Sequence, residues 1–294
     1  MHWLSKKRYI CFMLLPTLLV YSAYIILPII IASYYSLTRF SGIGEPEFIG
    51  LKNYQALLQD PFFWVSLKNT VIVLGVTLIV LIPSAFFLAL LLNRDVKGSN
   101  VLKALNFAPA VIAPILVGLI WVFILDPDMG FVNVFLQKIG LEQLAFQWIG
   151  GTTLTPYSVG VVESWRILGF IATIFLAGLA TIPREIYEAS DIDGANRVQK
   201  LIFITIPMLN ETFKINVILI ITFCFKIFET VLQLTNGGPN HLSEVLVTYM
   251  YNVTFISGEY GYGMAVAVVT LLITIVFMAL FMGLSRKRVE KKGV

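Results

Sequence analysis

Six long runs of hydrophobic residues alternate with shorter polar segments along the chain. Each run is close to the length, on the order of 20 residues, that an α-helix needs to cross the hydrocarbon core of a bilayer. The runs are Tyr9–Tyr34, Asn69–Leu92, Leu102–Leu125, Pro156–Ala180, Ile215–Leu234 and Ala265–Leu284. This pattern predicts an all-α membrane protein with six transmembrane helices in a single domain over residues 1–294.

The composition supports a membrane location. Hydrophobic residues make up 58% of the chain, charged residues only 13%, and the mean hydropathy is +0.85. A soluble domain of this size carries far more charge on its surface. The first run lacks a small-residue cleavage site, so we expect it to be retained as a span. Cys11 and Cys224 both lie within runs, so no disulfide framework is expected.

The basic residues predict the orientation. Six spans put both termini on one side, and fifteen Lys and Arg residues lie on that side against four on the other. Under the positive-inside rule, both termini and the segment around Gly194 are cytoplasmic, together with Lys97 and Lys291. Lys52, Glu142 and His241 are then expected outside. The net charge of +4 reflects this asymmetry, and no basic, aromatic-interleaved patch indicates nucleic-acid binding.

The polar segment between the fourth and fifth runs, residues 181–212, is rich in helix-forming residues. Pro183 suits the start of a helix, which we predict over Arg184–Asp193. Gly194 permits a sharp turn, and a second short helical stretch over Asn196–Phe203 follows. We expect Pro207 to end that stretch before the fifth span.

The sequence of this segment resembles a known motif. Residues 188–195 read Glu-Ala-Ser-Asp-Ile-Asp-Gly-Ala, and residues 204–207 read Ile-Thr-Ile-Pro. The combination resembles the coupling loop of the membrane subunits of binding-protein-dependent ABC importers. The resemblance implies that this hairpin docks into a cytoplasmic ATPase and is not an ordinary solvated connector. The implied coupling residues are Glu188, Ala189, Ser190, Asp193, Gly194, Ala195 and Pro207.

The resemblance covers about residues 10 to 285 and includes shorter segments. Asn69-Thr70 and Gly237-Gly238-Pro239 resemble segments of sugar-importer permeases. The sequence Asn236–Pro239 is similar to the F-type subunit of maltose transporters and the A-type subunit of glycerol-phosphate importers. The resemblance implies the type I ABC importer permease fold, in a compact six-span form in a bacterial cytoplasmic membrane.

The same resemblance implies partners. They are a second, G-type permease, a dimer of ATP-binding subunits and an extracytoplasmic solute-binding protein. The chain contains no G-x-x-x-x-G-K-[ST] phosphate-binding loop. We therefore expect a transport subunit with no enzymatic activity or cofactor of its own, with ATP bound by the partner. No residues are spaced to ligate a metal ion or to form a catalytic triad.

Four charged residues lie within the predicted spans. Glu163 and Arg166 are three residues apart in the fourth run, as are Lys226 and Glu229 in the fifth. Charges at this depth normally face protein or a wet cavity. Each pair has opposite signs at i, i+3 spacing, so each can neutralise itself on one helix face.

The alternative is that these residues line a substrate path. Related permeases bind substrate at this depth between the fourth and fifth spans, which favours Glu163 and Arg166. Trp165, Phe170 and Phe223 are candidate sugar-stacking surfaces, and Lys226 and Glu229 complete the candidate set. The substrate we expect is an oligosaccharide or related glycoside. A glycerol phosphate or acidic sugar, which Arg166 and Lys226 would attract, stays open, as does an ion-coupled secondary transporter.

Overall fold

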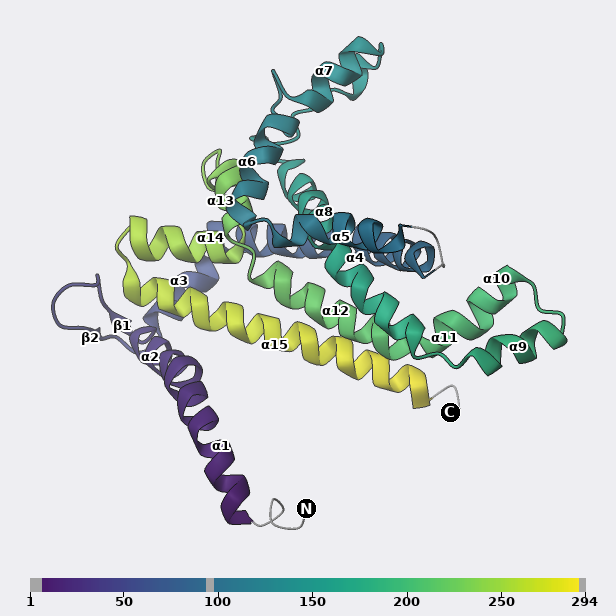
Figure 1. Ribbon diagram of the computed structural model, residues 1–294. Coiled ribbons are helices and arrows are strands. Elements are labelled where there is room, and N and C mark those ends of the chain that lie inside the picture. The colour runs from purple at the N-terminus through teal and green to yellow at the C-terminus, as the bar shows by residue number, and fades with distance from the viewer. Residues whose placement is uncertain (1–6, 94–97, 291–294) are drawn as a thin grey trace. The chain divides into compact units, whose positions relative to one another are not determined.

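Helices form nearly all the regular structure in the part of the chain that the computed structural model describes, residues 7–93 and 98–290 (Figure 1). The chain divides into two units. One contains the described residues up to Phe63 together with Met250–Leu272, and the other contains Trp64–Tyr249 and the remainder of the C-terminal helix. Lys97 and Lys291, for which the sequence predicts a cytoplasmic position, lie outside the described residues.

The apolar helices match the predicted number of spans. Within the described residues, four helices are long and apolar enough to cross a membrane, namely Phe12–Tyr35, Pro61–Leu92, Thr155–Ala180 and Tyr260–Ser285. Two further pairs meet at bends: Val101–Val111 with Pro114–Leu125 at 95°, and Arg197–Met208 with Asn210–Phe225 at 64°. If each bent pair is one span, the number is six.

The first unit contains the first span and a small hairpin. Helix α1 (Lys7–Tyr21), the π-helical turn η1 (Ser22–Ile26) and α2 (Leu27–Tyr35) form the span. The hairpin pairs β1 (Thr38–Arg39) with β2 (Glu47–Phe48) in antiparallel register.

The rest of the first unit is helical. It contains α3 (Lys52–Gln59), η4 (Asn252–Ile256) and the first part of α15 (Tyr260–Glu290). Phe48 pairs with Thr38 in the hairpin, and α3 begins at Lys52.

The second unit contains the helices from α4 to α14 and the last part of α15. Its elements are α4 (Pro61–Leu92), α5 (Ser99–Val111), α6 (Pro114–Leu125), α7 (Phe131–Lys138), η2 (Glu142–Leu144), α8 (Thr155–Ala180), α9 (Arg184–Ile192), α10 (Arg197–Lys200), η3 (Leu201–Thr205), α11 (Ile206–Met208), α12 (Asn210–Phe225), α13 (Glu229–Thr235) and α14 (Leu246–Tyr251). Helices α7 and α14 were not predicted, because each is shorter than a span.

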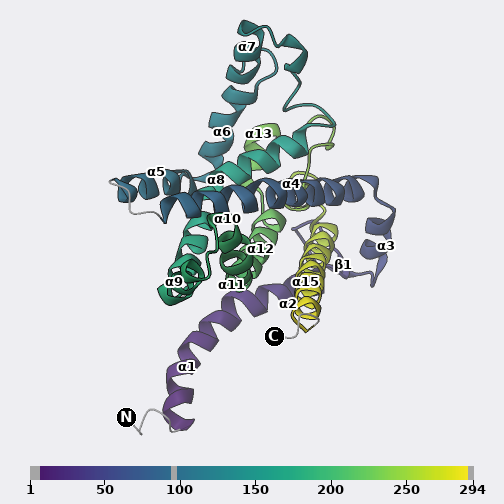
Figure 2. The ribbon, with the colours of Figure 1, turned by 90° about the vertical axis from the view of Figure 1, so that its right-hand side faces the viewer.

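Helix α8 is the centre of the second unit. It packs against α5 and α12, while α6 packs along α13 (Figure 2). Gly169 allows the closest of these approaches, because a Cβ atom there would lie 2.0 Å from the carbonyl oxygen of Asn106. The side chain of Phe175 is fully buried and contacts the rings of Phe86 and Phe213. Small residues at close helix crossings and aromatic packing are typical of membrane helix bundles.

The third span bends at a proline. Ile112 and Ala113 have extended backbone angles between α5 and α6. The ring of Pro114 disfavours a helical conformation for the preceding residue, and Pro114 itself suits the first turn of α6. The predicted span Leu102–Leu125 is therefore two helices at a steep angle.

The fifth span differs from the prediction at both ends. Helix α11 continues through Pro207 to Met208, and the bend falls at Leu209, so Pro207 does not end the stretch. Helix α12 ends at Phe225, and a separate helix, α13, begins at Glu229. The prediction of one helix over Ile215–Leu234 is therefore wrong.

Candidate functional site

The segment between α8 and α12 forms the predicted helical hairpin. It extends beyond the ends of those two helices (Figure 1). Helix α9 ends in a Schellman motif, in which the Ala195 N–H donates to the Ser190 carbonyl (2.9 Å) and the Gly194 N–H donates to the Asp191 carbonyl (3.1 Å). Gly194 has φ +75°, a left-handed conformation that favours glycine. The predicted turn at Gly194 is confirmed.

The second helix of the hairpin begins with a capping box. The Asn196 side chain accepts from the Gln199 N–H (2.9 Å), and the Gln199 side chain accepts from the Asn196 N–H (2.8 Å). This reciprocal pair satisfies two backbone donors at the helix start. Lys200 forms an ion pair with Asp191, and the hydroxyls of Tyr187 and Thr205 are 3.0 Å apart. The two arms of the hairpin are therefore joined by side chains as well as by the turn.

The hairpin exposes most of the predicted coupling residues. Glu188, Ala189, Asp193, Gly194 and Pro207 are exposed, and Ala195 is half-buried. Ser190 differs from these residues because its side chain is buried. Its hydroxyl donates to the Tyr187 carbonyl (2.7 Å).

The sequence reasoning did not select Ile192, which is 88% exposed beside the turn. Its place beside Gly194 at the tip of the hairpin was the only signal in the sequence that could have indicated its exposure.

The charged pair in the fourth span is formed. Glu163 is 3% exposed, and its Oε2 accepts from Arg166 Nε (2.9 Å) and a terminal guanidinium nitrogen (2.7 Å). Glu163 Oε1 is buried and has no hydrogen-bond partner among the described residues. The carboxylate is therefore neutralised by Arg166 and keeps one oxygen available to another donor.

The second charged pair is not formed. Lys226 is the residue that follows α12, with φ −110° and ψ 2°, and Glu229 begins α13. Both side chains are exposed, and among the described residues no ion pair joins them. Of the two alternatives, the i, i+3 pair is not formed here because the helix that would align the two side chains is interrupted.

Two aromatic contacts accompany the Glu163–Arg166 pair. The rings of Phe170 on α8 and Phe223 on α12 meet edge to face at 5.9 Å, and those of Trp165 and Trp121 at 5.6 Å. The indole nitrogen of Trp121 is buried without a hydrogen-bond partner in the described chain. Three of the predicted aromatic residues thus pack between helices, and the sequence reasoning did not select Trp121.

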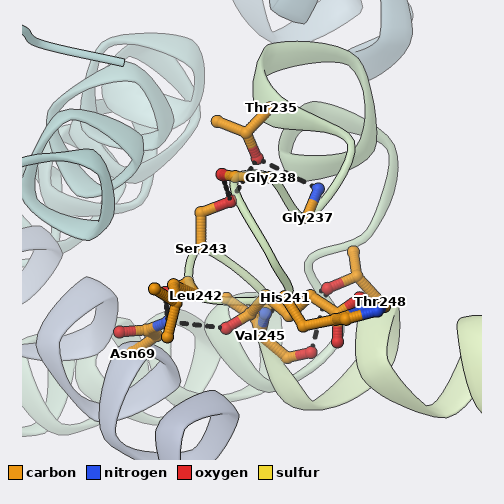
Figure 3. A network of polar contacts seen from close by, with 10 residues as sticks. Asn69, Thr235, Gly237, Gly238, His241, Leu242, Ser243, Val245 and Thr248 are labelled. Carbon is orange, nitrogen blue, oxygen red and sulfur yellow. Dashed lines mark hydrogen bonds and ion pairs between the residues drawn. The ribbon is translucent and has the colours of Figure 1, made fainter. Parts of the chain in front are cut away.

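A polar network connects two segments that resemble permease sequences. Asn69 on α4 donates through Nδ2 to the carbonyls of Leu242 (2.8 Å) and Glu244 (2.9 Å), which lie in the turn after α13 (Figure 3). The Leu246 N–H donates to the Thr70 hydroxyl (3.0 Å). Hydrogen bonds therefore join Asn69 and Thr70 on α4 to the turn after α13, although the two segments lie far apart in the chain.

The turn is also held internally. The Ser243 hydroxyl donates to the Gly238 carbonyl (2.6 Å) and contacts the Thr235 hydroxyl (2.9 Å) (Figure 3). Glu244 is fully buried, and its carboxylate lies 2.8 Å from Nδ1 of the exposed His241. These bonds hold the segment between α13 and α14 in one conformation against α4.

Comparison with known proteins identifies the family. Residues 81–291 match the model of the binding-protein-dependent transport system inner membrane component. The chain belongs to this family. The matched region includes α8, the hairpin and α12, but not Asn69 and Thr70. The chain is therefore a multi-pass membrane permease of the ABC importer type.

Individual relatives agree with this assignment. The arabinooligosaccharides transport system permease protein AraP of Bacillus subtilis is 34% identical over 96% of this chain and 90% of its own length. The trehalose/maltose transport system permease protein MalF of Thermococcus litoralis is 30% identical over 94% and 93%. The predicted resemblance to F-type sugar-importer permeases is confirmed.

The fold is that of a solved transporter. A chain from the crystal structure of a bacterial alginate ABC transporter in complex with alginate pentasaccharide-bound periplasmic protein aligns with a TM-score of 0.81. The identity is 23%, and the alignment covers 97% of this chain and 96% of the other. The predicted type I ABC importer permease fold is therefore confirmed.

Proposed function

We propose that this permease forms half of the translocation path of an ATP-driven carbohydrate importer in a bacterial cytoplasmic membrane. A second, G-type permease completes the path, a cytoplasmic ATPase dimer binds ATP, and an extracytoplasmic binding protein delivers the substrate. The observation that carries the proposal is the hairpin between α8 and α12. The hairpin exposes Glu188 on α9 and Asp193 and Gly194 in the turn, and its two arms lead into α8 and α12.

The hairpin suits mechanical coupling for a physical reason. The Schellman motif, the capping box and the Asp191–Lys200 ion pair connect α9 to α10, so a displacement of one arm moves the other. The chain after α10 continues through α11 to the bend at Leu209 and into α12. Movement imposed at the turn by an ATPase would therefore reach α8 and α12, which carry Glu163, Arg166 and Phe223. The chain itself would need no cofactor.

The candidate substrate path supports a hydroxyl-rich ligand. Glu163 Oε1 is an unused acceptor and the Trp121 indole nitrogen is an unused donor within the described chain. Trp165, which is partly exposed, offers an aromatic face of the kind that packs against sugar rings. The relatives named for arabinooligosaccharides and for trehalose and maltose support the same class, an oligosaccharide or related glycoside.

The ion pair favours a neutral substrate over an anion. Glu163 already balances the charge of Arg166, which leaves little net positive charge for a phosphate or carboxylate. The observation that favours an anionic substrate is the exposed Lys226 at the break after α12. Uptake of a panel of neutral and acidic glycosides by the assembled transporter distinguishes these two substrate classes.

Membership of the family argues against an ion-coupled secondary transporter. The complex purified through a tag on this chain should drive uptake into proteoliposomes with ATP and the binding protein. An ion gradient alone should give no uptake. Uptake driven by the gradient without ATP would contradict the proposal.

Coupling is tested by Gly194→Trp. We expect ATP-driven uptake to fall at least about tenfold, because the indole would hold the turn away from the ATPase. The chain should still be inserted, since no atom lies within 4 Å of the position that a Cβ would take. The measurement is uptake together with the amount of ATPase that co-purifies with the chain.

Gly140→Trp is the matched control. Gly140 has φ +77°, equally open surroundings and an exposed position after α7. A tryptophan at position 140 is strained by the positive φ in the same way as one at position 194. The proposal assigns no coupling role to position 140, so uptake should persist. If Gly194→Trp transports as well as Gly140→Trp, the hairpin is an ordinary connector.

A further inference from the structure

Asn216 on α12 is a fully buried polar residue within the fifth span. Both polar atoms of its side-chain amide, Oδ1 and Nδ2, are buried and have no hydrogen-bond partner among the described residues. Asn69 and Asn133 are buried too, but each donates two hydrogen bonds to backbone carbonyls. Buried amides are normally hydrogen-bonded, because water no longer solvates them. Asn216 is therefore an exception that requires a physical reason.

The amide of Asn216 faces an apolar stretch of α8. Thr212 lies four residues before it and Phe223 seven residues after it, so the three side chains share one face of α12. Thr212 contacts α8 at Gly178, where a Cβ atom would lie 2.5 Å from the Thr212 hydroxyl, and the ring of Phe223 meets that of Phe170. The buried residues of α8 between these two contacts are Ile171, Ala172 and Phe175. All three are apolar, so no side chain on this buried face of α8 can hydrogen-bond the amide.

Helix α12 is bounded by non-helical backbone at both ends. Leu209, at the 64° bend before it, has φ −87° and ψ 8°, and Lys226 after it has φ −110° and ψ 2°. Phe228, before α13, has φ −138° and ψ −67°. Residues at the ends of elements absorb the backbone changes when helices move as rigid bodies. Helix α12 can therefore shift against α8 without unwinding, and the hairpin leads into its first end.

We propose that Asn216 is a conformational switch residue. It destabilises the packing of α12 against α8 and favours a second position of α12 in which the amide is hydrogen-bonded. A buried polar group without partners raises the free energy of the arrangement that buries it. A smaller difference in free energy between two positions lets ATP binding shift α12 from one to the other. This inference rests on the proposed coupling function, since the hairpin supplies the displacement.

The first measurement is the thermal unfolding temperature of the assembled complex. Asn216→Leu replaces the amide by an apolar side chain of similar size, so the temperature should rise by about 2–4 °C. The matched control is Asn69→Leu, which removes two hydrogen bonds from a buried asparagine on α4, so its unfolding temperature should fall. An unchanged or lower temperature for Asn216→Leu would overturn the proposal, because the amide would then be satisfied in the packed position.

Cys224 provides a native reporter for the movement of α12. Its side chain is buried, and its thiol hydrogen-bonds with Thr77 on α4, so it should react with N-ethylmaleimide only when α12 moves. The background is Cys11→Ser, which removes the other cysteine of the chain. ATP should accelerate the labelling of Cys224 in this background. Asn216→Leu should reduce both the ATP-dependent labelling and the uptake about fivefold or more, because α12 then stays packed against α8.

Asn216→Ala is a second variant that does not depend on how leucine packs. It also lacks the amide, so ATP-dependent labelling and uptake should fall, although the cavity lowers the unfolding temperature. A complex that is merely destabilised would label Cys224 faster.

The remaining outcomes separate the switch from the transport function. ATP-dependent labelling that survives Asn216→Leu, or its absence in the Cys11→Ser background alone, would overturn the switch. ATP-dependent labelling in that background without carbohydrate uptake would contradict the proposed substrate class and leave the switch supported.

Discussion

Glu163 and Arg166 on α8, and Lys226 and Glu229 after α12, present the same pattern in the chain: opposite charges three residues apart within a predicted span. On α8 the helix is continuous from Thr155 to Ala180, and the two side chains meet at 2.7 Å. After α12 the helix stops at Phe225, and both side chains are exposed. Spacing alone therefore does not predict an ion pair, since the backbone between the residues must be helical.

The difference also separates two kinds of charge in a membrane protein. A buried carboxylate such as Glu163 is stable when a partner neutralises it. Lys226 and Glu229, by contrast, are accessible at a helix break, where hydration or a ligand can solvate them. We therefore expect the first pair to act as a unit and the second as two independent residues.

The largest effect should come from removing one member of the buried pair. Arg166→Ala leaves the Glu163 carboxylate buried without a counter-charge. Loss of one partner of a buried pair costs about 3–5 kcal/mol, so the inserted, folded fraction should fall sharply in a detergent unfolding titration. Arg184→Ala, at the exposed start of α9, is the control. Equal stability of the two variants would show that Glu163 is solvated or protonated.

Removing both Glu163 and Arg166 should show whether the pair serves only the stability of the protein or also transport. The double variant Glu163→Ala/Arg166→Ala carries no unpaired charge, so we expect the complex to assemble. If the pair also contacts substrate, uptake normalised to intact complex should fall about tenfold or more, since interactions with the passing ligand are lost. Unchanged uptake across the glycoside panel would leave the pair with a structural role alone.

The smallest effect is expected at the helix break. In a double-mutant cycle of Lys226→Ala and Glu229→Ala, the unfolding free energies should add to within about 0.3–0.5 kcal/mol. The corresponding cycle for Glu163 and Arg166 should show a coupling energy of about 0.5–3 kcal/mol. Both are measured by unfolding titrations of the full-length protein. A similar coupling energy for the two pairs would contradict the difference in backbone structure.

The hairpin between α8 and α12 was predictable because its signals are local. The turn needs a residue that tolerates positive φ, and Gly194 supplies it. Pro183 favours a helix start because its ring fixes φ, and Asn196 starts the second helix through a capping box, which acts over three residues. The predicted helix over Arg184–Asp193 agrees with α9, Arg184–Ile192, to within one residue. Hydrophobic run length likewise determined the number of spans, since the bilayer thickness sets it.

The break between α12 and α13 was not predictable. Residues 225–229 are Phe-Lys-Ile-Phe-Glu and include no glycine or proline, so no local signal marks an end. Ile227 is buried while Lys226 and Glu229 are exposed, an arrangement that depends on the packing of the surrounding helices. The missed hairpin of β1 and β2 has the same origin, because strand pairing is a contact between separate segments.

The sequence by itself determined that the chain is built from long apolar helices, where the hairpin between α8 and α12 turns and to which family the motif belongs. These features depend on apolar length, residue-specific backbone preferences and local caps, all of which act within a few residues. The tertiary structure alone decided that Glu163 is buried, that Lys226 and Glu229 stay apart, and that Asn69 holds the turn after α13. Those outcomes depend on contacts between helices that lie far apart in the chain, for which the order of residues carries no local signal.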